Sequence, residues 1–223
     1  MNARAPLRLA ILISGRGSNM SALARACQQG RLHARLSVVI ADRADAGGLP
    51  IARDLGIATA AVEHSRFPDR SAFEHALDEA LLNAGFDLLC LAGFMRILSP
   101  EFTARHAGRT LNIHPSLLPK YRGLHTHRRV LEAGDAEHGA SVHFVTAELD
   151  GGPVVLQSRL PVLRGDTEDS LAARVLATEH VIYPKTIGWL AEGRLQWRDG
   201  RPWLDNEPLT VPIVEDFDGT AQR

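Results

Sequence analysis

Short, nearly continuous apolar runs alternate with helical patterns throughout the first hundred residues of this chain. Continuous apolar strands are buried on both faces, as in parallel sheets that helices cover on each side. Right-handed crossovers between such strands build a doubly wound half of the Rossmann-like, nucleotide-binding type. The expected order is a strand over 9–13, a helix to Gln28, a strand over 36–41, a helix from Gly47 to Gly56, a strand over 59–62, a helix over 69–83 and a strand over 87–92.

The pattern changes after about residue 110, where apolar and polar residues alternate more regularly. Residues 141–146 and 154–160 flank the turn Asp150-Gly151-Gly152-Pro153, which indicates antiparallel or mixed pairing. The fold class is therefore α/β: a doubly wound, mostly parallel twisted sheet that continues into a mixed-strand C-terminal half.

Three further features are expected near the C-terminus. A long helix covers 167–190, with Thr167 and Ser170 available as capping residues. Trp197 and Trp203 flank Asp199-Gly200 in a terminal hairpin. Residues 206–223 are polar and contain prolines, so we expect a loose tail there.

Composition limits the classes of function. A net charge of -1 over 223 residues argues against a nonspecific nucleic-acid or membrane-surface binder. The longest apolar runs, such as 88–92, are too short to cross a bilayer, and the first residues lack the apolar segment of a secretion signal. Cys27 and Cys90 match neither metal-ligand nor disulfide spacing. We therefore expect a cytoplasmic protein with no nucleic-acid and no membrane partner.

A glycine-containing loop, Ser14-Gly15-Arg16-Gly17-Ser18-Asn19, joins the first expected strand to the first helix. Glycine lets the backbone approach an anion, and the free amides at a helix start carry partial positive charge. The loop therefore predicts a phosphate site, although a tight turn also needs glycine for its geometry alone. Met20 replaces the third small residue of the dinucleotide fingerprint, and no Walker Gly-Lys-Ser/Thr follows. One phosphate fits this loop better than a pyrophosphate.

Asn112 and His114 stand two positions apart in Leu-Asn-Ile-His-Pro-Ser. In a strand their side chains share one face, and Pro115, which lacks an amide hydrogen, ends the pairing beside the imidazole. Together with the loop carboxylate of Asp150, they can stabilise an oxyanion and can accept and donate a proton, as acyl transfer requires. Taken singly, each residue is more often structural, as a hydrogen-bonded strand residue or a turn aspartate.

Other patterns suggest different chemistry. His125-x-His127 looks like a metal pair, but it lacks further ligands at recognisable spacing, so a structural or substrate-contact role is favoured over zinc. Asp42 ends the second strand, where a dinucleotide-binding oxidoreductase keeps its ribose-binding acid. A noncatalytic binder of phosphoribosyl ligands is a third alternative, and it predicts affinity without turnover.

Four segments, in order and without large insertion over about residues 8–205, closely resemble the phosphoribosylglycinamide formyltransferases, the folate-dependent enzymes of purine synthesis. They are Ile-Ser-Gly-Arg-Gly-Ser-Asn at 13–19, Leu-Ala-Gly-Phe-Met-Arg-Ile-Leu at 91–98, Leu-Asn-Ile-His-Pro-Ser-Leu-Leu-Pro at 111–119 and Glu-Leu-Asp-Gly-Gly at 148–152. The third is shared across folate formyltransferases and a related deformylase, whereas the first is particular to the glycinamide enzymes. Arg16 in the first segment and Arg122, between Tyr121 and Gly123, depart from the pattern of this family.

The resemblance implies an enzyme that transfers the formyl group of 10-formyltetrahydrofolate, as co-substrate, to the amine of glycinamide ribonucleotide (GAR). The products are formyl-GAR and tetrahydrofolate, the partners are these small molecules, and no metal is needed. Deformylation is disfavoured because that enzyme normally carries an extra N-terminal domain. Formylation of methionyl-tRNA is disfavoured because no RNA-binding domain follows residue 205.

The resemblance also implies roles for individual residues. Asn112, His114 and Asp150 form the catalytic group, in which Asp150 keeps His114 protonated. Gly17, Ser18 and Asn19 hold the GAR phosphate and Glu179 contacts the ribose. The implied folate-binding residues are Arg70, Met95, Arg96, Ile97, Leu98, Asn112, Thr146, Ala147, Glu148, Leu149 and Asp150.

A single formyltransferase domain over 1–205 is expected. Its phosphate- and nucleotide-binding half covers about 1–100, and its catalytic and folate-binding half covers about 101–205. The expected oligomeric state is a monomer or a homodimer.

Overall fold

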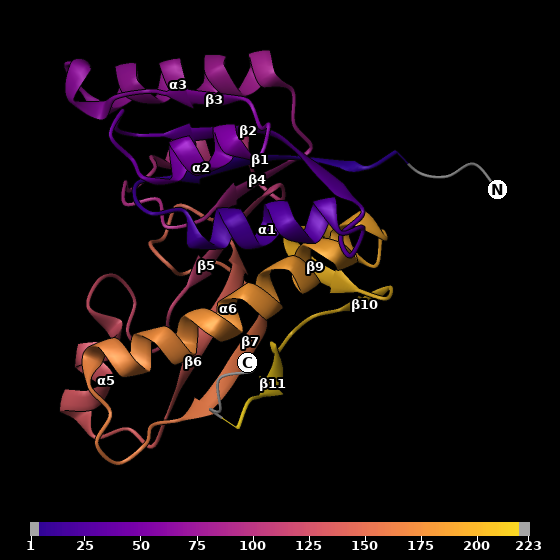
Figure 1. Cartoon of the computed structure of the whole chain (residues 1–223). Coiled ribbons are helices and arrows are strands. Elements are labelled where there is room, and N and C mark those ends of the chain that lie inside the picture. Colours follow the sequence, from indigo (N-terminus) through magenta and orange to yellow (C-terminus); the bar gives the residue numbers. More distant parts are fainter. Residues whose placement is uncertain (1–4, 219–223) are drawn as a thin grey trace.

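The computed structural model describes residues 5–218. Within this range, eight strands form one twisted sheet in the order β11-β7-β6-β5-β4-β1-β2-β3 (Figure 1). Parallel pairing joins β1 to β2 and to β4, β2 to β3, and β4 to β5, whereas β6 is antiparallel to both β5 and β7. The strands are β1 Leu7–Ile13, β2 Ala34–Ala41, β3 Thr59–Ala61, β4 Leu88–Leu91, β5 Thr110–His114, β6 Glu137–Phe144, β7 Val154–Pro161 and β11 Ile213–Asp216.

Helices connect and cover these strands, and a small antiparallel sheet follows the last long helix. The helices are α1 Ser18–Gln28, α2 Gly48–Asp54, α3 Arg70–Ala84, α4 Pro100–Arg105, α5 Thr126–Ala133 and α6 Glu168–Ala191, with a short 3-10 turn over His64–Arg66. The small sheet contains β8 Leu195–Arg198, β9 Arg201–Leu204 and β10 Glu207–Pro208. No described helix is both long and apolar enough to span a bilayer.

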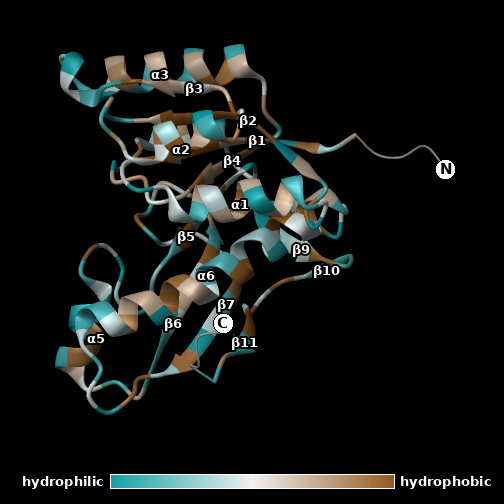
Figure 2. Ribbon diagram, in the orientation of Figure 1, coloured by the Kyte–Doolittle hydropathy of each residue, from teal (hydrophilic) through white to brown (hydrophobic). Residues whose placement is uncertain are grey.

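Both faces of the sheet are buried, which explains the continuous apolar runs. Along β1, Leu9, Ile11 and Ile13 belong to the core beneath α1, α2 and α6, whereas Ala10 and Leu12 belong to the core beneath α3 and α4. All five side chains are fully buried. In Figure 2, β1 and β2 are largely brown, whereas the helices alternate between teal and brown because only one face of each is apolar.

The long helix α6 crosses one face of the sheet and is fixed there by a buried tyrosine. The Tyr183 hydroxyl lies 3.1 Å from the carbonyl oxygens of both Leu91 in β4 and Leu111 in β5. The helix begins with a capping box between Thr167 and Ser170, as the sequence predicts. Glu179 lies one turn before Tyr183 and is therefore held close to the ends of these central strands.

The local elements expected from the sequence are confirmed in type and order. Asp69 caps α3, and Gly85, at a φ of 66°, ends it. The strands β6 and β7 pair antiparallel, as do β8 and β9 around Asp199-Gly200. The helices α4 and α5 were not predicted, because they contain only 6 and 8 residues, about two turns or fewer, which is too short for a clear apolar periodicity.

The expectation of a loose tail is wrong for part of residues 206–223. Residues 213–216 form β11, which pairs in parallel with β7 at the edge of the main sheet. Asp216 receives two hydrogen bonds from Arg159, and Glu215 pairs with Lys185. Four residues carry too little pattern to reveal a strand, and this one is stabilised by pairing with a distant segment. Residues 219–223 of the predicted tail lie outside the described residues.

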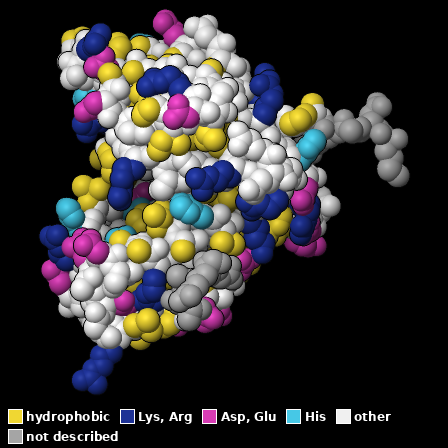
Figure 3. Space-filling view, in the orientation of Figure 1, with side chains coloured by type: hydrophobic (Ala, Val, Ile, Leu, Met, Phe, Trp, Pro, Cys, Tyr) yellow, Lys and Arg dark blue, Asp and Glu magenta, His cyan; other side chains and the backbone are white. Residues whose placement is uncertain are grey.

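Basic and acidic side chains are interspersed over the face of the molecule in Figure 3. This mixing agrees with the ion pairs along the chain, such as Arg8 with Asp87 at 2.7 Å and Arg194 with Asp205 at 2.8 Å. No large surface of one charge sign gathers on the face shown.

The strand order reverses between β1 and β4, because the chain runs outward from β1 through β2 to β3 and then returns to β4 and β5. In open parallel sheets, ligands bind outside the carboxyl ends of the strands at such a switch point. The loops that follow β1, β2, β4 and β5 therefore frame the expected binding region.

Candidate active site

A cavity of about 740 Å³ lies at this switch point. The loops after β1, β2, β4 and β5 line it, together with residues 123–127, Asp150 and Glu179. A second cavity of about 80 Å³ is lined by Phe94, residues 96–98 and residues 145–150, and it shares Arg96, Asn112 and Asp150 with the first. Two compartments therefore meet at the residues that the sequence marked for catalysis.

The glycine loop takes its shape from a close approach to the start of α2. Gly17 has a φ of 72°, and a Cβ on Gly17 would lie 2.9 Å from the Cα of Gly48. The amide of Gly48 donates to the Gly15 carbonyl at 2.9 Å. Gly17 and Gly48 therefore both require glycine because there is no space for a Cβ, and Gly17 also requires it for its positive φ. The loop presents the start of α1 to the large cavity, as a phosphate site requires.

Asn19 and Glu179 are brought together from positions 160 residues apart. The Asn19 Nδ2 donates to Glu179 Oε2 at 2.6 Å, and both side chains are buried. Burial raises the pKa of Glu179 to about 7, against the hydrogen bond from Asn19, which lowers it. This carboxyl therefore exchanges its proton near neutral pH at the edge of the large cavity.

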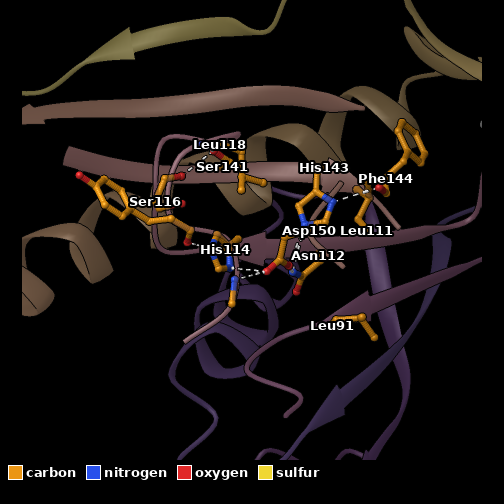
Figure 4. A network of polar contacts seen from close by, with 12 residues as sticks. Leu91, Leu111, Asn112, His114, Ser116, Leu118, Ser141, His143, Phe144 and Asp150 are labelled. Carbon is orange, nitrogen blue, oxygen red and sulfur yellow. Dashed lines mark hydrogen bonds and ion pairs between the residues drawn. The ribbon is translucent and has the colours of Figure 1, made fainter. Parts of the chain in front are cut away.

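Asn112, His114 and Asp150 converge, as Figure 4 shows. Asp150 Oδ2 lies 3.4 Å from His114 Nδ1, and Asp150 Oδ1 lies 3.4 Å from Asn112 Nδ2. The backbone amide of Gly123 donates to Asp150 Oδ2 at 2.9 Å. Asp150 has a φ of 47°, so the turn that precedes Gly151-Gly152 directs this carboxylate into the site at the cost of a left-handed backbone. The turn role and the site role of Asp150 therefore coexist.

The protonation of His114 is set by two opposing effects. Burial lowers the pKa of His114 and outweighs the carboxylate of Asp150, which raises it. Nε2 lies 3.0 Å from the Tyr121 carbonyl and donates to it, so Nδ1 is the nitrogen that gains or loses the proton. Asp150 thus acts on His114 in the expected direction, but burial keeps the pKa below its ordinary value.

Asp150 itself is favoured in its charged form. Burial alone would raise the pKa of Asp150, but His143, His114 and the Gly123 amide together lower it below its ordinary value. The carboxylate is therefore ionised at neutral pH and available as a proton acceptor.

His143 belongs to this group and was not singled out from the sequence. It stands directly opposite Asn112 in the antiparallel pairing of β5 with β6. Its Nδ1 donates to the Phe144 carbonyl at 3.0 Å, and its Nε2 lies 3.1 Å from Asn112 Nδ2 and 3.7 Å from Asp150 Oδ1. His143 therefore orients the Asn112 amide. Only the strand register places it there, and no local sequence signal identifies it.

The loop 117–125 closes the other side of the group formed by Asn112, His114 and Asp150. The Tyr121 carbonyl accepts the His114 Nε2 hydrogen, and the Gly123 amide binds Asp150, so one loop contacts both residues. Tyr121 has a φ of 57°, and its hydroxyl donates to Asp135 at 2.9 Å. The backbone of this loop therefore helps to hold the imidazole and the carboxylate in place.

Most of the predicted folate residues line the two cavities. Arg96, Ile97, Leu98 and residues 146–150 line the small cavity, and Met95 lines the large one. Met95, Ile97 and Leu149 are 61%, 59% and 48% exposed, so they form an apolar rim. Arg70 is different, because it is the exposed first residue of α3 and lines neither cavity.

The two other patterns noted in the sequence, His125-x-His127 and Asp42, make contacts within the protein. His127 Nδ1 lies 3.0 Å from His138 Nε2, and burial lowers the pKa of both rings, that of His138 to about 3. Among the described residues, no group of three or more His, Cys, Asp or Glu side chains is placed to hold a metal ion. Asp42 Oδ2 accepts a hydrogen bond from Arg96, whereas the buried Oδ1 of Asp42 has no hydrogen-bond partner among the described residues.

Comparisons with known proteins agree with this geometry. Residues 7–187 match the family model described as formyl transferase. The chain is 52% identical over 203 residues to the phosphoribosylglycinamide formyltransferase of Escherichia coli strain K12, covering 91% of this chain and 96% of that protein. It is 44% identical over 202 residues to the Haemophilus influenzae protein of the same name, covering 91% and 95%.

A solved structure gives the same result. The phosphoribosylglycinamide formyltransferase of Coxiella burnetii, determined in complex with CHES, superposes with a TM-score of 0.89 at 45% identity. The match covers 93% of this chain and 99% of that chain.

Proposed function

The chain belongs to the formyl transferase family, and we propose that it transfers the formyl group of 10-formyltetrahydrofolate to the amine of GAR. The products are formyl-GAR and tetrahydrofolate, in the synthesis of purines. The observation that carries this proposal is the convergence of Asn112, His114 and Asp150 where two cavities meet. One cavity suits a phosphoribosyl group and the other suits a flat ring with an apolar rim.

GAR occupies the large cavity in this proposal. Its phosphate binds the amides of Gly17, Ser18 and Asn19 at the start of α1, where the helix dipole favours an anion. Glu179 accepts or donates a hydrogen bond at the ribose hydroxyls. The raised pKa of Glu179, about 7, lets this side chain serve as either donor or acceptor near neutral pH.

The folate co-substrate occupies the small cavity and extends over its rim. Residues 95–98 and 146–150 contact the ring, partly through backbone atoms. Arg70 lines neither cavity, and its exposed place on α3 suits a contact with a solvent-exposed part of the co-substrate. No metal takes part.

Amine attack on the formyl carbon gives a tetrahedral intermediate whose oxygen becomes negative. Asn112 Nδ2 directs its two hydrogens toward His143, at 3.1 Å, and toward Asp150, at 3.4 Å. The longer of these contacts is weak enough to be exchanged for the developing oxyanion. A donor of this kind typically accounts for about 10²–10³ in rate.

The proton of the attacking amine passes to the His114–Asp150 pair, directly or through a water. His114 Nδ1 is unprotonated at rest, and the imidazolium that forms is stabilised by Asp150 and by the oxyanion. Collapse of the intermediate breaks the bond between the formyl carbon and N10 of the folate, and the same proton is delivered to that nitrogen. Holding both substrates side by side supplies much of the remaining acceleration.

The proposal extends to the setting of the enzyme. Residues 1–205 act as one formyltransferase domain, with the GAR phosphate bound by its first half and the catalytic group contributed by its second. Both cysteines are free thiols, which suits a cytoplasmic location. The active form is a monomer or a homodimer.

The test is a spectroscopic assay of tetrahydrofolate formation with and without GAR. We expect formation that depends on GAR and saturates in both substrates. Equal rates without GAR would indicate hydrolysis, and binding of both ligands without product would indicate a noncatalytic binder. Either result would contradict the proposed transfer.

A further inference from the structure

Asp42, which lines the large cavity, forms an ion pair with Arg96, which lines both cavities. Arg96 Nε donates to Asp42 Oδ2 at 2.5 Å. The Asp42 side chain is 1% exposed, whereas that of Arg96 is 41% exposed. The carboxylate is thus inside the protein and the guanidinium extends from it toward solvent.

The backbone of Asp42 is hydrogen-bonded on both sides. It directly follows β2, its amide donates to the Ile13 carbonyl, and its carbonyl accepts the His64 amide. Burying a carboxylate is costly unless a cation compensates it, and Arg96 is the partner that Asp42 contacts among the described residues. The position of Asp42 therefore determines where the guanidinium lies.

The ion pair uses only one side of the guanidinium. Within residues 5–218, neither terminal nitrogen of Arg96 has a hydrogen-bond or ion-pair partner in the protein. Arg96 lines both cavities, and Asp42 lines the large one. A guanidinium fixed through Nε presents its terminal nitrogens as a pre-oriented pair of donors, which is the geometry that binds carboxylate or phosphate oxygens.

The segment that carries Arg96 is also tied to the glycine loop. Ser14 donates its amide to the Gly93 carbonyl at 3.0 Å, and the Ser14 hydroxyl accepts the Met95 amide at 2.8 Å. With the contact between Asp42 and Arg96, three bonds join the phosphate side of the cavity to the folate side.

We propose that Asp42 is a positioning residue, which holds Arg96 at the junction of the cavities so that its terminal nitrogens bind an anionic oxygen of a substrate. This inference rests on the proposed function and adds to it a residue that does not itself touch a substrate. The anionic oxygen belongs either to the GAR phosphate or to the glutamate carboxylates of the folate, and binding measurements distinguish these sources.

The experiment compares Asp42→Asn with a matched control. Asp205→Asn makes the same change in an exposed ion pair away from both cavities, in which the side chains of Arg194 and Asp205 are 45% and 53% exposed. The probes are inorganic phosphate, 10-formylfolic acid, and the dimethyl ester of 10-formylfolic acid, in which both glutamate carboxylates are neutral. Affinities come from titration calorimetry, and kcat and both KM values from the tetrahydrofolate assay.

Asp42→Asn is expected to weaken one anionic probe by roughly tenfold, the size of one charged hydrogen bond. The affinity for the ester and the kcat should be unchanged in Asp42→Asn, and all of these quantities should be unchanged in Asp205→Asn. If Asp42→Asn weakens the binding of phosphate and raises the KM for GAR, the anion that Arg96 binds is the GAR phosphate. If it weakens the binding of 10-formylfolic acid and raises the KM for the folate, the anion is a glutamate carboxylate. The proposal would be overturned if Asp42→Asn bound both anionic probes as tightly as the wild-type protein or more tightly. It would also be overturned if the binding of all three probes were weakened by the same factor.

A second variant keeps the test decisive if Asp42→Asn unfolds. Arg96→Lys retains the charge but lacks the fork needed to bind Asp42 and an anion together, so it should weaken the same probe by a similar factor. Combining the two substitutions should add little, because both disrupt one unit. Calorimetry also separates the proposal of formyl transfer from the proposal that Arg96 binds an anion, because the probes bind without reacting. If the wild-type protein showed no turnover, the proposed transfer would be contradicted, but the binding data would still test the anion contact.

Discussion

Replacing Asp150 by Asn changes one charge at the centre of the proposed catalytic group and little else. The new amide oxygen can still accept the Gly123 amide, which now lies 2.9 Å from Asp150 Oδ2. Because that contact is retained, we expect the 117–125 loop and the fold to persist. The stabilisation of the His114 imidazolium is lost.

The separation of the two groups sets the size of the effect. His114 Nδ1 lies 3.4 Å from Asp150 Oδ2, and unit charges at that distance interact by about 5 kcal/mol at an effective dielectric of about 20. This value is an upper bound, because water reaches the open cavity. Since each factor of ten in rate is about 1.4 kcal/mol, we expect kcat to fall on the order of 10²–10³-fold, with both KM values within about threefold.

Steady-state assays of tetrahydrofolate formation measure this loss, with Asp205→Asn as a control for removing an exposed carboxylate from a different ion pair. Because Asp150 raises the pKa of His114, its removal should also move the pH dependence of the residual rate to lower pH. A near-normal kcat in a folded variant would remove Asp150 from the chemistry, and a loss confined to KM would make it a binding residue.

Three further changes test other parts of the site. His143→Leu removes the ring nitrogen that lies 3.1 Å from Asn112 Nδ2 and orients that amide, and should lower kcat by roughly tenfold without changing the KM for GAR; an unchanged kcat would refute this role. Gly48→Ala places a methyl group 2.6 Å from Ile13 Cδ1 and 3.1 Å from the Cα of Gly17, so urea unfolding should show a loss of roughly 1–3 kcal/mol and the KM for GAR should rise, whereas an effect limited to folate would contradict the phosphate assignment. The pKa of Glu179 rises on folding from 4.5 to about 7, so wild-type stability falls as pH rises through that window, by on the order of 3 kcal/mol. Urea unfolding at pH 5 and pH 8 should show a smaller fall for Glu179→Gln, and an equal fall in both proteins would refute the assignment.

The predicted elements that the structure confirms have strong local signals. The run Leu-Ala-Ile-Leu-Ile at 9–13 forms a strand because both faces of β1 are covered, and the capping residues of α6 lie within one turn of each other. Sequence periodicity was too short to reveal α4 and α5. The strand β11 was missed for a different reason, because its stability depends on pairing with β7, more than fifty residues away.

The sequence by itself determined the α/β class, the glycine loop and the placement of Asn112 and His114 on one face of a strand, because these follow from local dihedral preferences and side-chain alternation. Only the tertiary structure decided which distant groups meet. The strand register places His143 opposite Asn112. The path of α6 brings Glu179 into hydrogen-bond distance of Asn19. The fold also brings Arg96 into contact with Asp42. It also decided the pKa of His114, because burial and the distance to Asp150 exist only when segments far apart in the chain pack together.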